Sequence, residues 1–533
     1  MSLVGAAFVR LFDRIDQALL SRWAPWVIAG LTGLLVAWLM GGLNPEPWVY
    51  DEAAYLLQAK IFATGHWSAP GRPLPEFFEQ LHVFVTPRLV PKYPPGHALL
   101  MVPGIWLGMA ALIPLVATTA TGGLIFRLAR GLGGHWVGLL TWLVWITAPE
   151  ELYLRPSYLS QTSTTLMWLG VWWSVERWRQ GGGRWLIVAS LLVALAAITR
   201  PITAIALALP VAVVVLRRLW EERSFTPALA GLIAALPILA LAPLWSFEST
   251  GRAFPTPYSE YSRVYVPWNM PGFSIDRSPP RRAEIPAITR FRTEWLPIHE
   301  GHTVARLPAI ALARLKGIGT TFFGDGGFPD GAVPWRWVLL GAALIGVVRP
   351  PRAMWPALAG APILFLTMLW LASRPLWTVY YFEIFPVLAF VVALGVVRVA
   401  EGMSRMAGAS WRAGPTPRFV SGVILAGTLV AVPGTVERVV RAKQQQEDLR
   451  LVQTDLRRAV EQLPGRAIVF IGTGTAHRPF ESYVMNEPDL DRARVWLVND
   501  RGEDNKRLLS FAKDRAGYFF NPGSGQIHPL GPR

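Results

Sequence analysis

The stretch Trp23–Gly42, WAPWVIAGLTGLLVAWLMGG, decides the class of fold. It contains no charged side chain, and Arg10, Arg14 and Arg22 precede it. A helix of about 20 residues rises about 30 Å, which matches the hydrocarbon core of a bilayer. No small-residue cleavage site follows the apolar run, so we interpret it as an uncleaved first membrane span and not as a signal peptide.

Apolar runs of similar length recur along the chain. Of its 533 residues, 52% are hydrophobic and only 16% are charged, which is far too apolar for a soluble protein of this size. We therefore predict an all-α polytopic membrane protein with about eleven transmembrane helices. The predicted crossings are Trp23–Gly42, His97–Leu128 (kinked or re-entrant as far as Leu115), Trp136–Pro149, Ser157–Val175, Trp185–Ile198, Pro201–Leu216, Ala228–Phe247, Pro334–Val348, Ala353–Leu371, Tyr380–Val397 and Phe419–Val436.

The distribution of charge predicts the orientation. The chain carries 51 Lys and Arg against 35 Asp and Glu, a formal charge of +16, and most arginines fall in loops on one side of the predicted spans. The positive-inside rule places that side, with the N-terminus, in the cytoplasm. As a separate expectation, the membrane is a bacterial inner (plasma) membrane. The loops at about 44–96 and 248–331 and the C-terminus are then extracytoplasmic.

Composition also limits the possible partners and cofactors. No basic patch interleaved with aromatic residues stands on a polar domain, so we exclude a nucleic-acid partner. The chain has no cysteine, which excludes disulfides, thiolate nucleophiles and cysteine-based metal sites. The basic surplus instead indicates contact with anionic membrane lipid.

The composition changes after Val436. Residues 1–436 form the predicted transmembrane domain, and 437–533 form a small soluble α/β domain outside the membrane. Glu437–Glu461 is charged with helical spacing, and three short strand-like runs follow it. These runs are Ala467–Ile471, Val495–Val498 and Tyr518–Phe520.

Two adjacent acids, Asp51 and Glu52, follow the first predicted span. Carboxylates at a bilayer edge are costly and usually functional. One of the two could be the general base that takes a proton from a sugar hydroxyl. The pair equally fits the first turn of a helix, where acids stabilise the N-terminus, and the two roles are compatible.

Several basic or aromatic residues could bind a phosphate on the same side. Lys92-Tyr93-Pro94-Pro95 is a stiff turn before an apolar run, although its Lys and Tyr could simply lie at the membrane interface. Arg374 and Arg200 occupy outer loops, against the topological bias, and an arginine can bind phosphate through two parallel hydrogen bonds. Glu383 enters a span and needs a partner, for which Arg374 or an interfacial water is plausible.

Further residues are weaker candidates. Glu150 and Glu151 could be a second acidic site or a solvated loop, and Tyr258 could stack on a sugar or belong to an interfacial belt. His299 and His302 could share a helical face, but no third metal ligand is evident. Gly472-Thr473-Gly474 is a GxG without the rest of a nucleotide fingerprint.

Taken in order, these motifs resemble the GT-C class of membrane glycosyltransferases, in the branch of protein O-mannosyltransferases and lipid A aminoarabinose transferases. The resemblance covers about Arg10–Val436 and rests on Tyr50-Asp51-Glu52-Ala53-Ala54-Tyr55, Lys92-Tyr93-Pro94-Pro95-Gly96, and Arg374 with Tyr380-Tyr381-Phe382-Glu383. The chain departs from the pattern at Tyr93, where relatives carry a basic residue. It also lacks a second acid around Leu159-Ser160-Gln161.

The resemblance implies a glycosyltransferase that uses a polyprenyl-phosphate-linked sugar and inverts the anomeric carbon. Asp51 and Glu52 would be catalytic, and Arg374, Lys92, Tyr93 and Arg200 would bind the donor phosphate. The acceptor would be a hydroxyl of a glycan, lipid or protein; no cofactor is required, and a divalent metal is possible without being indicated. A transporter or flippase of lipid-linked sugars is the alternative, although charges clustered at the outer edge favour chemistry there. The expected substrate-binding residues are Tyr55, His97, Glu150, Tyr258, Tyr381 and Glu383.

Overall fold

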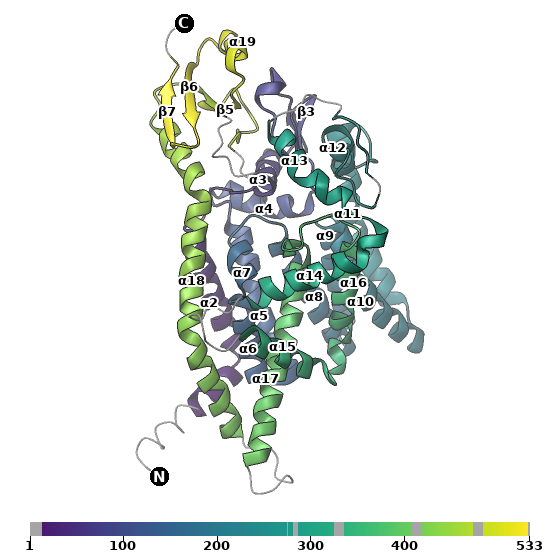
Figure 1. Cartoon of the computed structure of the whole chain (residues 1–533). Helices are drawn as coiled ribbons and strands as arrows, with labels where there is room; N and C mark the ends of the chain where they lie inside the picture. The colour runs from purple at the N-terminus through teal and green to yellow at the C-terminus, as the bar shows by residue number, and fades with distance from the viewer. Residues whose placement is uncertain are drawn as a thin grey trace.

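The computed structural model describes residues 13–273, 275–280, 286–324, 335–407, 417–472 and 483–530. This part of the chain is mainly helical, with a short sheet in the first long loop and a second sheet near the C-terminus (Figure 1). The all-α membrane fold with a small C-terminal α/β region is thereby confirmed. The helices of the main body are α2 (Ala24–Met40), α4 (Gly96–Trp106), α5 (Leu112–Gly133), α6 (His135–Ile146), α7 (Pro149–Leu154), α8 (Gln161–Arg179), α9 (Arg184–Ala197), α10 (Pro201–Glu221), α11 (Thr226–Thr250), α14 (Leu307–Phe323), α15 (Trp335–Val347), α16 (Trp355–Met368), α17 (Phe385–Ala407) and α18 (Pro417–Glu461).

Among the described residues, five helices are long and apolar enough to cross a membrane, or seven if two bent pairs each count as one span. The predicted number of eleven is not confirmed. Helices α4, α6 and α9 are apolar but contain only 10–17 residues. Each of them is too short to cross a hydrocarbon core of about 30 Å. Helix α8 is long enough, but its first turns, Gln161–Thr165, are polar and buried inside the protein.

Close helix crossings depend on small residues. A Cβ atom on Gly346 of α15 would lie 1.8 Å from the Val391 carbonyl oxygen, and one on Gly395 of α17 would lie 1.8 Å from the Ala342 carbonyl oxygen. Only glycine fits at either position. Small residues at helix interfaces are a common feature of membrane proteins, because they let two backbones approach closely.

One end of the molecule carries both sheets, and we call it the sheet-bearing end (Figure 1, top). Its first sheet has the strand order β1-β3-β2. The surface helices α12 and α13 lie beside this sheet (Figure 1), 3-10 helix η1 packs against the second sheet, and 3-10 helix η4 packs against α8 and α16 of the main body. The bounds are α3 (Tyr50–Ala63), β1 (Ala69–Pro70), η1 (Pro75–Phe77), β2 (Val83–Phe84), β3 (Arg88–Pro91), α12 (Pro257–Tyr265), α13 (Pro286–Glu300), η2 (Val304–Arg306), η3 (Arg352–Met354) and η4 (Thr378–Ile384).

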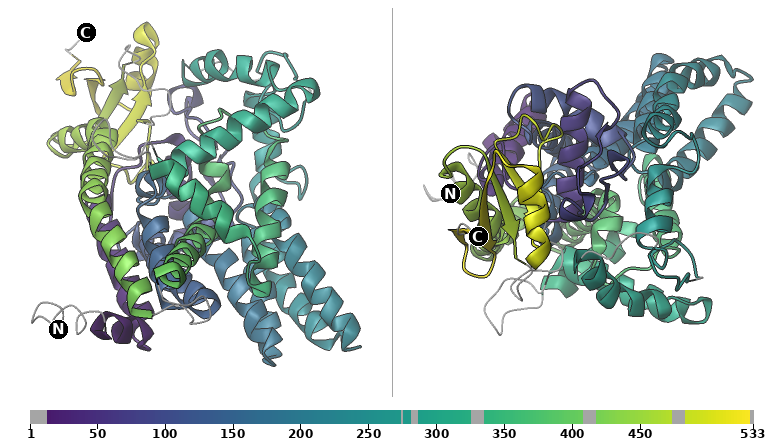
Figure 2. Two further views of the ribbon diagram at one scale, coloured as in Figure 1. Left: turned by 60° about the horizontal axis from the view of Figure 1, so that its bottom comes forward. Right: turned by 90° about the horizontal axis from the view of Figure 1, so that it is seen from above.

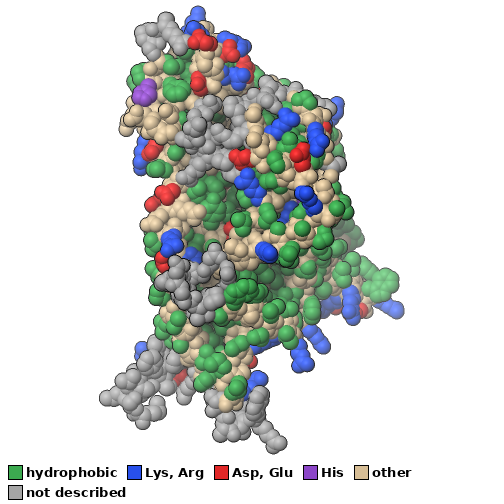
Figure 3. Space-filling model, in the orientation of Figure 1, with side chains coloured by type: hydrophobic (Ala, Val, Ile, Leu, Met, Phe, Trp, Pro, Cys, Tyr) green, Lys and Arg blue, Asp and Glu red, His purple; other side chains and the backbone are tan. Residues whose placement is uncertain are grey.

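The side chains on the visible face divide along the long axis. Figure 3 shows hydrophobic side chains over the middle of the molecule, with charged side chains gathered toward its two ends. Many of these apolar side chains are exposed, including Ile205, Leu209 and Val213 of α10 and Leu232 and Leu236 of α11. A broad exposed apolar belt of this kind belongs in lipid. The chain is therefore an integral membrane protein.

Helix α18 connects the two ends of the molecule. It runs unbroken through 45 residues, and the predicted domain boundary at residue 437 lies inside it. Two views show it lying along α2 (Figure 2), where Ala442 packs with Leu39. Phe419–Val436 therefore forms only the first part of a helix that continues into the sheet-bearing end.

The C-terminal sheet has the strand order β5-β4-β6-β7. Strand β4 pairs in parallel with both neighbours, and β7 pairs with β6 in antiparallel orientation. The core of this sheet includes Phe77 and Phe78 from the first long loop. The two regions therefore form one packed unit. The bounds are β4 (Ala467–Ile471), β5 (Val495–Asn499), η5 (Gly502–Asp504), α19 (Asn505–Phe511), β6 (Ala516–Asn521) and β7 (Gln526–Pro529).

Candidate active site

Asp51 lies on the first turn of α3, at the sheet-bearing end. Helix α3 begins after Val49, whose backbone is extended and whose side chain makes no cap. The Asp51 side chain is 41% exposed, so its carboxylate reaches solvent. Its Oδ1 accepts a 2.5 Å hydrogen bond from the Tyr93 hydroxyl, and its Oδ2 lies 3.8 Å from Nε2 of His82. An exposed carboxylate with a fixed orientation is suited to accept a proton.

Lys92 lies in a cage of tyrosine rings beside Asp51. Its Nζ is 5.2 Å from the ring centroid of Tyr93, 4.7 Å from that of Tyr258 and 5.2 Å from that of Tyr261. Burial lowers the pKa of Lys92 to about 8, and the Asp51 charge opposes part of this shift. Among the described residues Lys92 has no ion-pair or hydrogen-bond partner at Nζ, and the residue is only 3% exposed, so the tyrosine rings are the groups that stabilise its charge.

His82 is a residue of this site that the sequence analysis missed. It has a left-handed backbone (φ 70°), and its N–H donates to the Tyr261 hydroxyl at 2.9 Å. Burial and the neighbouring Lys92 lower the pKa of His82 well below its ordinary value, so the imidazole is neutral. Its position in Leu81-His82-Val83 carries no recognisable motif, and only the folded loop brings it to Asp51.

Tyr55 and His97 pack against the group formed by Asp51, Lys92 and Tyr93. The Tyr55 ring stacks on that of Tyr93 with centroids 4.6 Å apart, and its hydroxyl donates to Ser160 Oγ at 3.0 Å. His97 is fully buried, and its Nε2 lies 2.8 Å from the Tyr158 carbonyl oxygen. Because a carbonyl only accepts, Nε2 carries the proton and Nδ1 accepts from Ser163 at 2.9 Å. Both nitrogens are thus occupied, and His97 positions the site without facing it.

Glu52 has a different role from Asp51. It is fully buried, and its two carboxylate oxygens accept the backbone N–H groups of Trp48 and Tyr158. Each oxygen already accepts one N–H, and burial keeps the carboxylate away from solvent. Glu52 therefore holds the chain around α3, and the expected assistance to Asp51 is structural.

Arg200 and Glu383 form a second polar cluster. Arg200 Nε lies 3.1 Å from Glu383 Oε1, which also accepts from the Thr164 hydroxyl at 2.6 Å. The suggested partner Arg374 is therefore replaced by Arg200. Arg200 interacts electrostatically with Tyr55 and Tyr258, which joins the two clusters. Among the described residues only its Nε has a hydrogen-bond partner, so both terminal nitrogens are available to an anion.

Arg374 and Tyr381 make other contacts. Arg374 Nη2 lies 3.2 Å from Glu294 of α13, and its guanidinium stands over the Trp295 ring. The hydroxyl of Tyr381 accepts from Arg314 at 3.2 Å. Arg314 is buried and also donates to carbonyl oxygens that follow α16. These contacts hold outer loops and helix ends together.

The remaining candidates are buried or half-buried. Glu151 is fully buried and pairs with Arg155, whereas Glu150 is half-buried beside Thr378. His299 packs edge-on against Trp268, and His302 stacks on Phe273. Within the described ranges no three His, Asp or Glu side chains gather as a metal site. Gly472 follows β4, and the rest of Gly472-Thr473-Gly474 lies outside the described residues.

An apolar cavity adjoins the second cluster, between helices α8, α9 and α10. Thr164 and Thr203 lie at its wall and contact Glu383 and Arg200, respectively. The cavity is thus apolar along its length and polar where it meets the arginine. Its lining residues are Thr164, Trp168, Val171, Val193, Ala196, Thr203, Ala204, Leu207 and Ala208.

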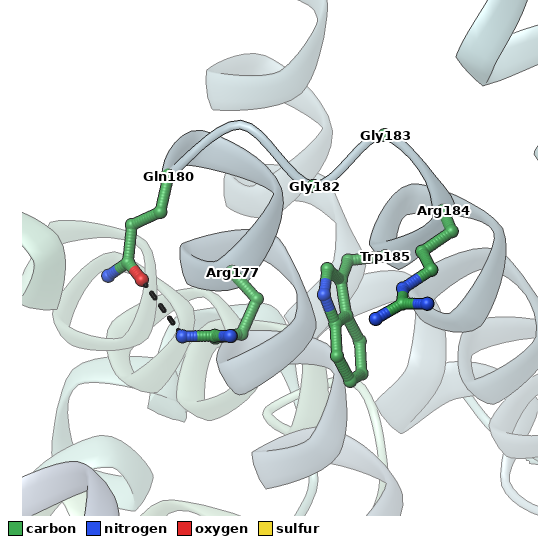
Figure 4. Close-up of a pocket in the computed structure, with 6 residues that line it drawn as sticks. All are labelled: Arg177, Gln180, Gly182, Gly183, Arg184 and Trp185. Atoms are coloured by element: carbon green, nitrogen blue, oxygen red, sulfur yellow. Dashed lines mark hydrogen bonds between the residues drawn. The ribbon is translucent and has the colours of Figure 1, made fainter.

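A second cavity lies at the turn between α8 and α9. Arg177, Gln180, Arg184 and Trp185 line it together with two glycines, and Arg177 donates to Gln180 Oε1 at 3.3 Å (Figure 4). None of the six lining residues is a carboxylate, so this cavity lacks the base that the chemistry above requires.

Comparison with known proteins supports the fold. No family profile matches the chain, and no curated protein matches it in sequence. The crystal structure of ArnT from Cupriavidus metallidurans in the apo state is similar, with a TM-score of 0.54, 15% identity and coverage of 94% of both chains. A second structure of that ArnT, bound to undecaprenyl phosphate, is similar with a TM-score of 0.47 and 14% identity over 94% of both chains. ArnT is an aminoarabinose transferase of lipid A with a GT-C fold, so the resemblance to that branch is confirmed at the level of the fold.

Proposed function

We propose that the chain is a glycosyltransferase that moves a sugar from a polyprenyl-phosphate-linked donor to an acceptor hydroxyl. The observation that carries this proposal is the Asp51 carboxylate beside the Lys92 cation, which has no ion-pair partner among the described residues. A base next to a cation that can bind a phosphate is what such a transfer needs. The GT-C fold shared with ArnT adds support.

The donor would lie across the two clusters. Its phosphate would bind to Lys92 and to the terminal nitrogens of Arg200, and its prenyl chain would lie in the lipid against the exposed apolar side chains of the helices. Tyr93 would orient Asp51 and would not contact the phosphate directly, because its hydroxyl donates to the carboxylate. Tyr258, which is 37% exposed over Lys92, would pack against the sugar.

The reaction would proceed in one displacement. Asp51 takes the proton of the acceptor hydroxyl, and the oxygen attacks the anomeric carbon from the side opposite the phosphate. The bond between the anomeric carbon and the phosphate oxygen breaks, so the configuration inverts and polyprenyl phosphate leaves. Lys92 and Arg200 stabilise the charge that develops on that leaving group. These residues offset the charge without a metal, although a divalent cation could assist.

The sheet-bearing end would face the extracytoplasmic side of a bacterial inner membrane. Arginine-rich turns, including the one between α8 and α9 with Arg177, Arg179 and Arg184, would then be cytoplasmic, as the positive-inside rule requires. A lipid-linked donor suits this side, because it is already activated and needs no nucleotide there.

The test is Asp51→Asn in the full chain, purified in lipid nanodiscs with a synthetic undecaprenyl-phosphate-linked sugar and cell-envelope fractions as acceptors. Release of undecaprenyl phosphate, followed by mass spectrometry, should fall by about 10²–10⁴, the usual contribution of a general base. Asp455→Asn is the matched control, since Asp455 is 37% exposed and its ion pair within the described part of the chain is with Arg458 of its own helix. Turnover at the wild-type rate in Asp51→Asn would overturn the base assignment. Movement of the donor across a bilayer without release of undecaprenyl phosphate would indicate a transporter instead.

A further inference from the structure

Glu52 joins two chain segments that are far apart in sequence. Its Oε2 accepts the N–H of Trp48 at 2.9 Å, and its Oε1 accepts the N–H of Tyr158 at 2.7 Å. Trp48 precedes α3, and Tyr158 precedes α8. The buried carboxylate therefore ties the start of one helix to the start of the other.

Arg450 of α18 binds the carbonyl groups of the same two segments. Its Nε donates to the Glu46 carbonyl oxygen at 2.9 Å, and its Nη2 donates to the Pro156 carbonyl oxygen at 2.5 Å. Its Nη1 donates to Gln446 Oε1 at 2.5 Å, which fixes the guanidinium on α18. Arg450 is only 6% exposed, so water competes little for these bonds. Each segment is therefore held by two hydrogen bonds: a backbone N–H donates to Glu52, and a backbone carbonyl oxygen accepts from Arg450. We call Glu52 and Arg450 with these four bonds the clamp.

The charges of Arg450 and Glu52 also support each other. Burial raises the pKa of the Glu52 carboxyl above its ordinary value, and the Arg450 charge opposes that rise. A charged Glu52 accepts both N–H groups more strongly than a neutral side chain would. Removal of Arg450 would thus weaken the clamp at both of its sides.

The clamped segments carry the reactive groups. Asp51 is adjacent to Glu52 on the first turn of α3. Ser160, at the start of α8, accepts the hydroxyl of Tyr55, whose ring stacks on Tyr93. Tyr93 in turn donates to Asp51. A shift of either segment would therefore move Asp51 relative to Lys92 and Tyr93.

We infer that Arg450 is a positioning residue for sugar transfer, which acts through Glu52 and the backbone at Glu46 and Pro156 to fix Asp51 in the site. The inference rests on the proposed function and extends it to α18. The reactive side chains lie on other elements, and the charged second half of α18 helps to hold them in place.

The experiment compares Arg450→Met and Arg450→Lys in the full chain in nanodiscs, with the undecaprenyl-phosphate-linked sugar as donor. The kcat of Arg450→Met should fall about 10²-fold, because a displacement of about 1 Å at a reacting group can cost that much. The donor KM should stay within about twofold, since Lys92 and Arg200 are untouched. Arg450→Lys keeps the charge near Glu52 but cannot reach both carbonyls. Its kcat should therefore lie between that of the wild type and that of Arg450→Met.

Arg441→Met is the matched control. Arg441 lies on the same helix, is 70% exposed and, among the residues that the structure describes, pairs with Glu437 alone, so its loss should leave kcat unchanged. The number of sites that bind undecaprenyl phosphate measures the concentration of folded enzyme. This measurement distinguishes a misfolded variant from a folded variant in which Asp51 is displaced. The double variant Glu52→Gln/Arg450→Met should lose no more kcat than the worse single variant, because both act in one clamp.

Three outcomes decide the inference. A loss of kcat per donor-binding site with an unchanged donor KM supports it. Wild-type kcat in Arg450→Met, or equal losses of kcat and donor binding in both Arg450 variants, overturns it and leaves the proposed function standing. If the wild-type chain itself releases no undecaprenyl phosphate, the proposed function fails, and the role of Arg450 in transfer fails with it.

Discussion

Asp51 and Glu52 are neighbours in sequence, but helix geometry sends them to opposite environments. Successive residues of an α-helix differ by about 100° in direction, so two adjacent acids cannot share one face. Asp51 reaches the open site, with 41% of its side chain exposed, whereas Glu52 is fully buried among backbone donors. One carboxylate is thus available for chemistry, and the other stabilises the loop that presents it.

This division predicts different effects of neutralising each acid. Glu52→Gln should lower thermal stability, because an amide replaces one of two acceptor oxygens with a donor that faces a backbone N–H. A buried donor without a partner costs about 1–3 kcal/mol. Asp51→Asn should leave the melting temperature unchanged while it removes transfer. Thermal unfolding in detergent measures both, and equal shifts for the two variants would contradict the division of roles.

The cage around Lys92 predicts a pH dependence. The pKa of Lys92 is lowered to about 8, so its charge is present below that pH and disappears as the pH rises through it. The donor's phosphodiester does not titrate in this range. We therefore expect kcat/KM for the donor, which reports the free enzyme, to fall with an inflection near pH 8.

Lys92→Arg is the informative variant for that profile. A guanidinium stays charged throughout, so the inflection near pH 8 should disappear even if the absolute rate is lower. An inflection that persists in Lys92→Arg would assign the titration to another group. Profiles between pH 6 and pH 10 would cover the expected transition.

The sequence identified Asp51, Lys92, Tyr93, Tyr55, Tyr258 and Arg200, which the structure places in two connected clusters. These residues carry local signals: an acid after a span, a Pro-Pro turn and an arginine against the charge bias. His82 and Arg450 have no such signal on their own. Gln446, Arg450 and Gln453 recur at helical spacing as a buried polar stripe, which in sequence looks like a solvated helix face.

At the scale of elements, the length of each helix distinguishes the predicted spans that can cross a membrane from those that cannot. The apolar runs of α5, α10, α11, α17 and α18 belong to helices long enough to cross a membrane. Composition alone does not distinguish these from short buried helices such as α4 and α6, because both are apolar throughout. Helical spacing was predicted on both sides of Val436, but not that one helix runs through, since a change from apolar to charged residues marks the water interface and not the end of a helix.

Glu383 of η4 joins two of these helices, α8 and α10, through Thr164 and Arg200. Breaking a buried ion pair from one side typically costs about 3–5 kcal/mol, because the other charge stays behind. Glu383→Gln should therefore lower the melting temperature of the purified protein. The control Glu437→Gln removes an exposed pair with Arg441, which should contribute little. Equal melting temperatures for Glu383→Gln and the wild type would show that Glu383 is dispensable for packing.

At the scale of the whole molecule, the two ends of the sequence share one core. Phe78, from the loop after α3, packs its ring 5.7 Å from that of Trp496 in β5. Arg72 of the same loop donates to the carbonyl oxygens of Glu487 and Pro488. A boundary drawn from composition separates these regions, although they fold against each other. The C-terminal region therefore buttresses the loop that carries His82 and Lys92.

This shared core predicts that the C-terminal sheet depends on the first loop. Phe78 is 1% exposed, and deletion of a buried phenyl group typically costs about 3–5 kcal/mol. In Phe78→Ala, backbone amides of β4, β5 and β6 should exchange with solvent faster, as hydrogen–deuterium exchange can measure. Transfer should also slow, because His82 and Lys92 follow Phe78 in the same loop. Phe511→Ala is the matched control, since Phe511 lies in α19 beside the same sheet but is 59% exposed. Unchanged exchange in Phe78→Ala would mean that the sheet is stable by itself, and its contact with the loop would then have no part in holding the site.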